Sequence, residues 1–247
     1  MNHTENVSRR RILKSGAVLG GLAGTALLAQ TQTSGSKDAF GSAYSKDNCA
    51  LLIVDPYNDF MSEGGKMYKA TLETATEVGF YENMRKLIPA VRASGMAVVI
   101  VPHHRAVKGD YDHWQAVTSS QRGSAGIMLF AAGTWGGEWH PEFGPKPGDI
   151  VIKEHWAQSG FANTDLDQQL KQHGIRKVIL VGFIANTCVE STGRYAMELG
   201  YHVTLVKDAT AAFSKDAMHA AHVVNGPTYA HAITTTLALI EGLPKKS

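Results

Sequence analysis

Short runs of apolar, mostly β-branched residues alternate with longer segments of mixed polarity along most of the chain. Four of these runs are almost continuously apolar, and a fifth resembles them. Unbroken apolar character is typical of strands covered on both faces, because neither face then meets water. We therefore predict strands at 50–54, 97–101, 149–152, 177–181 and 202–206.

The intervening segments predict helices at 77–93, 164–173, 188–199 and 215–224. Gly95, Gly174 and Gly200 stand where helices commonly end. Strands that alternate with helices through right-handed crossovers form a mostly parallel sheet with helices on both faces. The predicted fold class is therefore α/β, a three-layer α/β/α or Rossmann-like architecture with about six strands. Ligands of such folds bind at the carboxyl ends of the strands.

The first 36 residues differ in composition from the rest of the chain. Three arginines, Arg9 to Arg11, precede an uncharged run rich in Gly, Ala and Leu from Ser15 to Ala29. That run is shorter than the roughly 20 residues that a membrane-spanning helix needs. The pattern predicts an export signal at 1–36 and one folded domain at 37–247, with a signal-anchor as the alternative.

The paired arginines resemble the twin-arginine (Tat) signal of bacterial proteins, with Ile12 at the position where Phe is commoner. The resemblance implies recognition by the Tat export machinery and a location in the periplasm or outside the cell. A clean cleavage motif is missing, so the mature N-terminus is expected between residues 29 and 43.

Composition and charge narrow the class of protein. Hydrophobic residues make up 44% of the chain, which is enough for a core and excludes a disordered chain. The formal net charge is +2, but the leader holds four basic residues against one acidic residue. The body is therefore close to neutral, and no nucleic-acid partner is predicted.

Three reactive residues follow predicted strands: Asp55, Lys153 and Cys188. Each alone has an ordinary explanation, as a turn residue, a solvated charge or a small buried residue. Together they form a nucleophile, a carboxylate that can accept the thiol proton, and an ammonium that stabilises the anions. Cys188 also stands at the start of a predicted helix, where the helix dipole favours a thiolate and a low thiol pKa.

Four motifs around these residues resemble those of the isochorismatase-like cysteine hydrolases, over about residues 48–240. Asp55 to Phe60 is similar to the family's D-x-Q-N-D-F, with Tyr57 in place of the usual Gln. Lys153 with Ser159 to Thr164 resembles its K-x(n)-S-A-F-x-x-T segment. Gly182 to Val189 resembles the nucleophile loop, and 207–210 the run after the fifth strand.

The resemblance implies roles for these residues. Cys188 is the expected nucleophile, Asp55 the general base and then acid, and Lys153 the electrostatic support. The N–H groups of Ile184 and Cys188 form the expected oxyanion hole, next to a cis peptide between Phe183 and Ile184. Members that cleave isochorismate commonly lack the cysteine, so we predict acyl transfer at a small amide or ureide. Dimers or tetramers are common among such proteins, which implies a homo-oligomer.

Histidines raise the alternative of a metal-assisted amidase of the nicotinamidase type. Such members carry Asp-x-His after the second strand, whereas this chain has Val-Pro-His-His-Arg at 101–105. His103, His104, His113 and His155 lack a recognisable ligand spacing, so we predict no metal and no cofactor. His103 and His104 are interpreted as substrate contacts, or equally as histidines bonded to loop backbone.

An aromatic segment at 108–143 connects the second and third predicted strands. It is interpreted as a lid or a subunit contact, with a small satellite core as the alternative. Aromatic residues near the strand ends predict a compact pocket with apolar walls. The substrate-binding candidates are Tyr57, Asn58, Phe60, His103, His104, Trp114, Trp135, Trp156 and Phe161.

The two cysteines cannot pair. Cys49 begins the first predicted strand and Cys188 belongs at the opposite edge, about 20 Å away, whereas a disulfide needs Cα atoms within roughly 7 Å. Cys188 is therefore predicted to be a free thiol. A non-catalytic binding or thiol-sensing protein on the same fold stays open as the second hypothesis.

Overall fold

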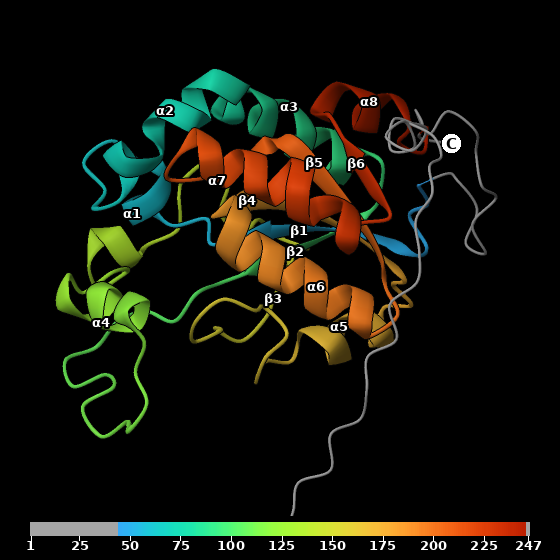
Figure 1. Ribbon diagram of the computed structural model, residues 1–247. Helices are drawn as coiled ribbons and strands as arrows, with labels where there is room; N and C mark the ends of the chain where they lie inside the picture. The colour runs from blue at the N-terminus through green and yellow to red at the C-terminus, as the bar shows by residue number, and fades with distance from the viewer. Residues whose placement is uncertain (1–43, 246–247) are drawn as a thin grey trace, which may run out of the picture. The chain divides into compact units, whose positions relative to one another are not determined.

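A parallel six-stranded sheet forms the centre of residues 44–245, the part of the chain that the computed structural model describes (Figure 1). The strand order is β3-β2-β1-β4-β5-β6, and every pair is parallel. This confirms the predicted fold class. The strands are β1 Cys49–Val54, β2 Ala97–Val101, β3 Ile150–Val151, β4 Lys177–Phe183, β5 His202–Ala211 and β6 Ala232–Thr234.

The central strands are apolar because both of their faces are covered. All six residues of β1 and all seven of β4 are buried. β3 lies at the edge of the sheet, where Val151 is exposed, and only two residues pair with β2. The strand predicted at 149–152 is therefore shorter in the structure, because an edge strand with one neighbour has fewer partners to extend it.

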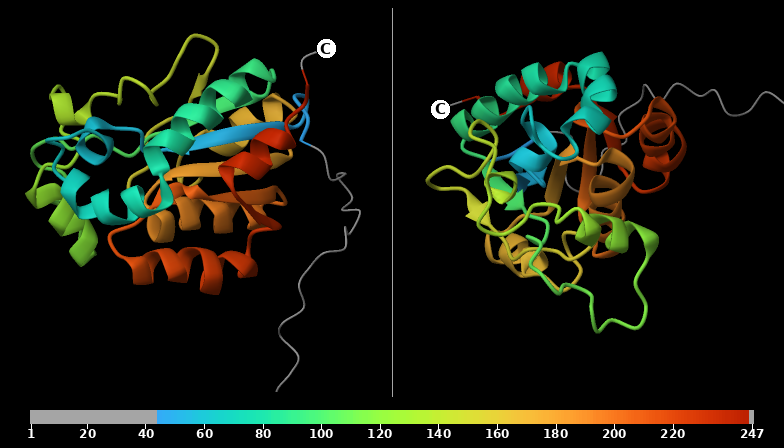
Figure 2. Two further views of the ribbon diagram at one scale, coloured as in Figure 1. Left: turned by 90° about the horizontal axis from the view of Figure 1, so that it is seen from above. Right: turned by 90° about the vertical axis from the view of Figure 1, so that its left-hand side faces the viewer.

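Helices cover the sheet on both faces (Figures 1 and 2). α2 Tyr68–Val78, α3 Phe80–Ala93 and α8 Thr236–Glu241 pack over one core cluster, and α5 Leu166–Gln172 and α6 Glu190–Glu198 over the other. The shorter elements are α1 Asn58–Met61, α4 Ser119–Gly126, η1 Trp135–Gly137, η2 Ala185–Val189, α7 Lys215–His219, η3 Ala220–Asn225 and η4 Gly226–Thr228.

Helix boundaries differ from the prediction at one informative place. The helix predicted at 77–93 begins at Phe80 as α3, because Gly79 adopts a left-handed conformation (φ 69°) that ends the preceding helix α2 at Val78. Glycine takes this conformation without the steric cost that a side chain brings. Helices α2, α4 and α8 and strand β6 were not predicted. Each has too few apolar residues, or too short an apolar run, to give a recognisable periodic pattern.

The order of the strands places a ligand site between β1 and β4. The chain runs from β1 outward through β2 and β3, and then returns to place β4 on the other side of β1. Loops that leave two adjacent strands in opposite directions open a crevice at their carboxyl ends. Asp55 follows β1 and Cys188 follows β4, so the topology brings both loops to this crevice.

The segment 108–143 lies beyond the carboxyl ends of the strands, together with α1 (Figures 1 and 2). Thr118 and Gln121 form a reciprocal capping box at the start of α4. Phe130 and Phe143 belong to the core, whereas Trp114 and Trp135 are exposed. The segment therefore contributes to the main core and not to a separate satellite core, and other residues of it line the crevice.

The predicted leader at 1–36 lies outside the described residues. Within residues 44–245, no helix is both long and apolar enough to cross a membrane.

Candidate active site

Three reactive side chains converge in the crevice: Asp55, His155 and Cys188. One ligand atom of each lies within 4.8 Å of those of the other two, and all three residues are buried. Nε2 of His155 lies 3.0 Å from Oδ1 of Asp55, and both of these side chains are completely shielded from solvent. The structure thus brings together two of the three predicted catalytic residues, and adds a histidine.

Asp55 is held by the backbone on either side of it. Its amide donates to the carbonyl oxygen of Val101 at 3.0 Å, and its own carbonyl accepts from the amide of Tyr57 at 2.8 Å. The φ angle of Asp55 is +55°, in the left-handed region that Asp and Asn tolerate better than most residues. In this conformation the carboxylate lies within reach of both His155 and Cys188.

Cys188 is mounted on a tight loop between β4 and α6. Gly182 has φ +108°, and a Cβ there would lie 2.2 Å from the carbonyl oxygen of Val54, so only glycine fits. The peptide between Phe183 and Ile184 is cis, as the family resemblance implies. The helical turn η2 then places Cys188 at the entry to α6, with its sulfur at the wall of a cavity.

The thiol of Cys188 is protonated at rest. Burial raises its pKa well above the usual value, and the neighbouring Asp55 carboxylate raises it further. Hydrogen bonds from the Thr187 hydroxyl and the Ile184 amide act in the opposite direction, but they do not prevail. The expectation of a low thiol pKa is therefore reversed, because burial and a like charge outweigh the helix start.

Lys153 is not part of this group. Its side chain is exposed, and its backbone amide donates to Oδ1 of Asp165 at 2.7 Å. Oδ1 of the Asp55 carboxylate is hydrogen-bonded to the ring of His155. The buried Oδ2 has no N–H or O–H donor among residues 44–245. The lysine lines neither cavity at the site and lies close enough to Asp165 to lower the pKa of that carboxyl.

His155 occupies the place expected for the lysine. Its amide donates to the carbonyl of Pro102 at 2.9 Å, and its carbonyl accepts from the amide of His104 at 2.7 Å. These bonds extend the β2–β3 pairing past the end of β3 and fix the imidazole over Asp55. The sequence indicated His155 only as one of four histidines without a recognisable metal-ligand spacing. Its position two residues beyond Lys153 was the one signal that it could lie near Asp55.

His103 lies between His155 and the solvent side of the crevice. Its ring centroid is 5.1 Å from that of His155, and the rings meet edge to face. Burial lowers the pKa of His103, although the Asp55 carboxylate acts to raise it, so His103 is neutral near pH 7. His103 is therefore available as a neutral hydrogen-bonding group facing the cavity.

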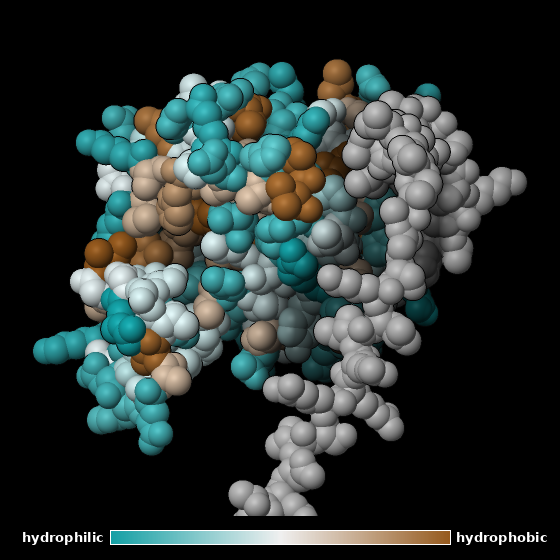
Figure 3. All heavy atoms as spheres, in the orientation of Figure 1, coloured by the Kyte–Doolittle hydropathy of each residue, from teal (hydrophilic) through white to brown (hydrophobic). Residues whose placement is uncertain are grey.

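An inner cavity of about 350 Å³ opens at Cys188. Its walls are largely apolar and come from Phe60, Met67, Ile127, Leu129, Phe130 and Phe213. Figure 3 shows apolar residues gathered between α1 and α4, in the part of the molecule where this cavity lies. A pocket of this kind holds a small molecule with few polar groups, as the sequence predicts.

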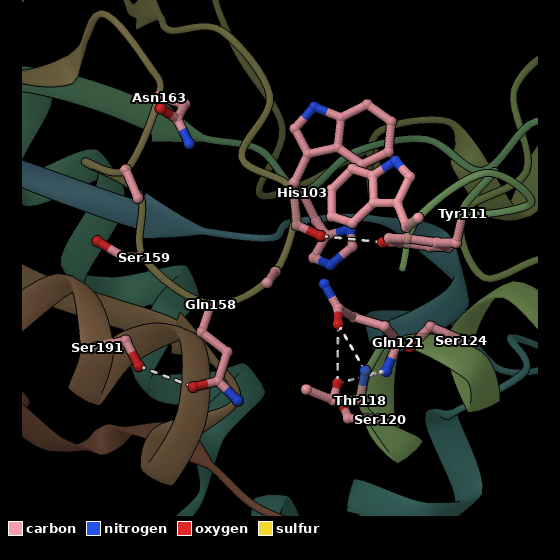
Figure 4. Close-up of a pocket in the computed structure, with 14 residues that line it drawn as sticks. His103, Tyr111, Thr118, Ser120, Gln121, Ser124, Gln158, Ser159, Asn163 and Ser191 are labelled. Carbon is pink, nitrogen blue, oxygen red and sulfur yellow. Dashed lines mark hydrogen bonds between the residues drawn. The ribbon is translucent and has the colours of Figure 1, made fainter. Parts of the chain in front are cut away.

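An outer cavity of about 550 Å³ adjoins the inner one (Figure 4). His103 lines both cavities and Phe60 lines the inner one, whereas Trp114 and Trp156 line the outer one. These four predicted binding residues therefore face cavities. Met67, Phe130, Phe213 and Gln158, which the sequence did not single out, face them as well.

The other five predicted binding residues line neither cavity. Tyr57 is buried, stacks on Trp139 and donates its hydroxyl to the carbonyl of His103 at 2.8 Å. Asn58 donates to the carbonyl of Trp135 at 2.9 Å and thereby ties α1 to η1. These two residues support the loops around the site and do not face a ligand.

The remaining three lie elsewhere for clear reasons. His104 is held by Asp110 at 2.9 Å, behind the ring of Trp156. Trp135 is exposed at the surface beside Gly64. Phe161 is buried in the second core cluster, where its ring stacks with Tyr195.

Asp55, His155 and Cys188 are also residue types that bind zinc. Among residues 44–245, this is the one group of such side chains that could hold a metal ion. The same geometry serves a nucleophilic cysteine with a base, so the two interpretations share their residues.

The chain belongs to the isochorismatase family, because the isochorismatase domain model matches residues 49–237. It is 33% identical over 190 residues to the ureidoacrylate amidohydrolase RutB of Rhizobium rhizogenes, covering 71% of this chain and 75% of that protein. The protein of the same name from Variovorax paradoxus is also 33% identical, covering 73% of this chain and 75% of its own length.

Solved structures agree on the fold. The N-carbamoylsarcosine amidase of Thermoplasma acidophilum is 28% identical with a TM-score of 0.56, covering 76% of this chain and 96% of that one. A cysteine hydrolase from Pseudomonas syringae pv. phaseolicola has a TM-score of 0.65 at 23% identity, covering 81% of this chain and 94% of that one. The family resemblance read from the motifs is confirmed.

Proposed function

We propose that this protein hydrolyses the carbon–nitrogen bond of a small amide or ureide through a thioester on Cys188. It is an amidohydrolase, in keeping with the ureidoacrylate amidohydrolases to which it is related. The observation that carries the cysteine mechanism is the placement of the Cys188 thiol beside the Asp55 carboxylate, at the wall of a cavity. A nucleophile needs a base within reach, and the Asp55 carboxylate, itself bonded to His155, stands next to the thiol.

In this mechanism the resting thiol is neutral, and Asp55 takes its proton as the sulfur attacks the substrate carbonyl. The N–H groups of Ile184 and Cys188 stabilise the oxyanion of the tetrahedral intermediate. Asp55 then gives the proton to the departing amine or ammonia, leaving a thioester. Water, deprotonated by Asp55, attacks the thioester, releases the acid and restores the thiol.

His155 orients the base in this proposal. Its Nε2 bonds Oδ1 of Asp55, which leaves Oδ2 to exchange the proton with Cys188. A buried carboxylate needs such a partner, because an ionised group without one carries a large desolvation penalty. In this chain an imidazole supplies what an ammonium was predicted to supply.

Replacing His155 and Lys153 in turn tests which of the two residues supports the Asp55 carboxylate. We expect His155→Gln to lower kcat by about 10- to 100-fold, the loss of a hydrogen bond to a buried charged group. Lys153→Gln, two residues away and exposed, should stay within about twofold of wild type, since its side chain acts on Asp165 and not on the Asp55–Cys188 pair. Steady-state kinetics of both variants on one substrate measure this, and equal losses would contradict the assignment.

The test of the proposed function is a substrate screen. Primary amides, ureides and carbamates are incubated with the purified protein, and ammonia release is measured. Hydrolysis of at least one class by wild type, with a stoichiometric acid product, supports the proposal. Turnover of none of these classes by folded protein would overturn it.

A metal-assisted hydrolase is the second candidate, because Asp55, His155 and Cys188 include three zinc-ligand types within 4.8 Å. In that case the metal would activate water and Cys188 would be a ligand. Metal analysis of the active protein separates the two candidates. The cysteine mechanism predicts full activity with less than about 0.1 metal ion per chain and no effect of a chelator.

A thiol sensor is disfavoured by the same site. A sensing cysteine needs an accessible thiolate, whereas Cys188 is buried and its pKa is raised. Both cysteines are free, as the spacing predicts, so no disulfide stores a redox state among residues 44–245.

We further propose export by the Tat machinery and a homo-oligomeric enzyme in the periplasm or outside the cell. The basis for export is the paired arginines and the apolar run before Ala29. The Arg9→Lys, Arg10→Lys double variant should keep the protein in the cytoplasm, because the export signal is read through both guanidinium groups. Fractionation and immunoblotting measure this, with unchanged export of the variant as the contradictory result.

A further inference from the structure

The inner and outer cavities form one continuous cleft. Five residues line both of them: His103, Ser120, Ser124, Ala157 and Gln158. The inner end holds Cys188, and the outer end lies between α4 and the loop at 157–163 (Figure 4). A molecule that presents its carbonyl to Cys188 therefore has room to extend outward past His103.

The outer cavity has one aromatic wall. Trp156 packs against Trp114 with ring centroids 5.4 Å apart, and Tyr111 meets both rings edge to face. Trp114 and Trp156 remain 47% and 37% exposed, although both are large apolar groups. Two adjacent exposed tryptophans at the mouth of a catalytic cleft form a surface on which a flat group can stack.

This aromatic wall is held in place from behind. The His104 ring stacks on Trp156 at 3.8 Å between centroids, and Asp110 and Glu154 both contact His104. The Tyr111 hydroxyl donates to the backbone carbonyl of Trp156 at 3.2 Å. Because the rings are already held in place, a stacking ligand does not have to order them, and binding therefore costs less conformational entropy.

The opposite walls carry hydroxyl and amide groups. Figure 4 shows Gln121 and Ser124 of α4 on one side of the outer cavity, and Gln158, Asn163 and Ser191 on the other. None of the residues that line either cavity, within the described part of the chain, is Asp, Glu, Lys or Arg. A carboxylate on the substrate would therefore lose its hydration with no cation to replace it.

We propose that the substrate is an uncharged amide or ureide with a flat aromatic or heteroaromatic group, which stacks on Trp114 and Trp156 while the carbonyl reaches Cys188. This proposal rests on the proposed function and adds the substrate class. The inner cavity of about 350 Å³ is enough for the reacting group, and the outer one of about 550 Å³ takes the ring. Amide and hydroxyl groups opposite the tryptophans bond the polar edge of a heteroaromatic ring.

Kinetics with matched substrates test the substrate class. Wild type is compared on three amides of one acyl length that end in a methyl group, a phenyl ring or a carboxylate. We expect kcat/KM to be at least about tenfold higher for the phenyl than for the methyl amide, and lowest for the carboxylate. An equal or higher kcat/KM for the carboxylate would overturn the proposal.

The Trp114→Ala variant shows where the preference arises. Its ratio of kcat/KM for the phenyl over the methyl amide should fall by about tenfold, mainly through KM, since stacking acts on binding. Val224→Ala is the control, because Val224 is also an exposed apolar residue and lines neither cavity. A ratio unchanged in Trp114→Ala would overturn the proposal.

A binding measurement separates failure of this proposal from failure of the proposed function. The Cys188→Ala protein is titrated with the unreacted phenyl and methyl amides, and tryptophan fluorescence is followed. Tighter binding of the phenyl amide by about tenfold supports the substrate class even if no turnover is found. If Trp114→Ala instead changes the oligomeric state in light scattering without altering selectivity, the wall is a subunit contact and the proposal is wrong.

Discussion

Replacing Cys188 by alanine is expected to lower kcat/KM by about 10⁴-fold or more, because Cys188 supplies the one thiol among the residues that line the inner cavity, and it stands beside Asp55. The change removes one sulfur atom from a side chain at a cavity wall, so the fold should tolerate it. Turnover of the best amide from the screen, measured by ammonia release, gives the result. Stability measured by thermal unfolding confirms that the loss is chemical.

Cys49→Ala is the matched control for this prediction. Cys49 is also a buried free cysteine, but it begins β1 at the opposite end of the strand from the crevice. Its replacement should leave kcat/KM within about twofold of wild type. If Cys188→Ala retains native turnover while folded, the thioester mechanism is wrong whatever the substrate.

The Asp55→Asn variant is expected to change two properties in opposite directions. Turnover should fall by about 10²- to 10⁴-fold, because amide groups neither accept the thiol proton nor return it. The Cys188 thiol should at the same time react faster with iodoacetamide, because removal of the Asp55 charge takes away one cause of its raised pKa. Asparagine accepts the positive φ of this position, so the loop should keep its shape.

The pH dependence of the alkylation rate tests the direction of the predicted change in the Cys188 pKa. In wild type the rate should keep rising as the pH increases past 9, since the thiol pKa lies above its usual value. In Asp55→Asn the same rise should come at lower pH. A variant that alkylates more slowly than wild type at every pH would contradict the contact between Asp55 and Cys188.

Much of the fold could be predicted from the sequence because its signals are local. The runs at 50–54 and 177–181 are apolar at every position except the buried Lys177. Asp55 directly follows β1, and Gly182 lies one residue before the end of β4. Short elements were missed for the converse reason. Strand β6 has three half-buried residues and α4 has no buried residue, so neither leaves a periodic pattern.

The candidate site was only partly predictable, because its residues are far apart in the sequence and come together only in the folded chain. Asp55 and Cys188 follow central strands, and they meet as the topology requires. β1 ends where the sequence predicts, and β4 runs two residues further. Lys153 and His155 follow an edge strand, where the pairing slips by one residue between Ile100–Val151 and His103–His155, and the sequence carries no signal of that slip. Tyr57 looked like a pocket residue in sequence, yet Trp139 and Phe130 enclose its ring.

The raised pKa of Cys188 could not be foreseen from its place at a helix start. A helix start favours a thiolate only where solvent or a cation shares the stabilisation. Here the sulfur is buried and faces the Asp55 carboxylate, and Lys153, the expected supporting cation, lies outside the group. The sequence indicates the identity of the nucleophile, whereas its resting charge depends on packing.

The most direct test of the central claim is to trap the acyl group on Cys188. The protein is mixed with an activated anilide, whose good leaving group makes acylation faster than thioester hydrolysis, and is quenched in acid within milliseconds. Peptide mass spectrometry should then show the acyl mass on Cys188, with a burst of released aniline equal to the enzyme concentration. Steady turnover with no burst and an unmodified Cys188 would contradict a thioester intermediate.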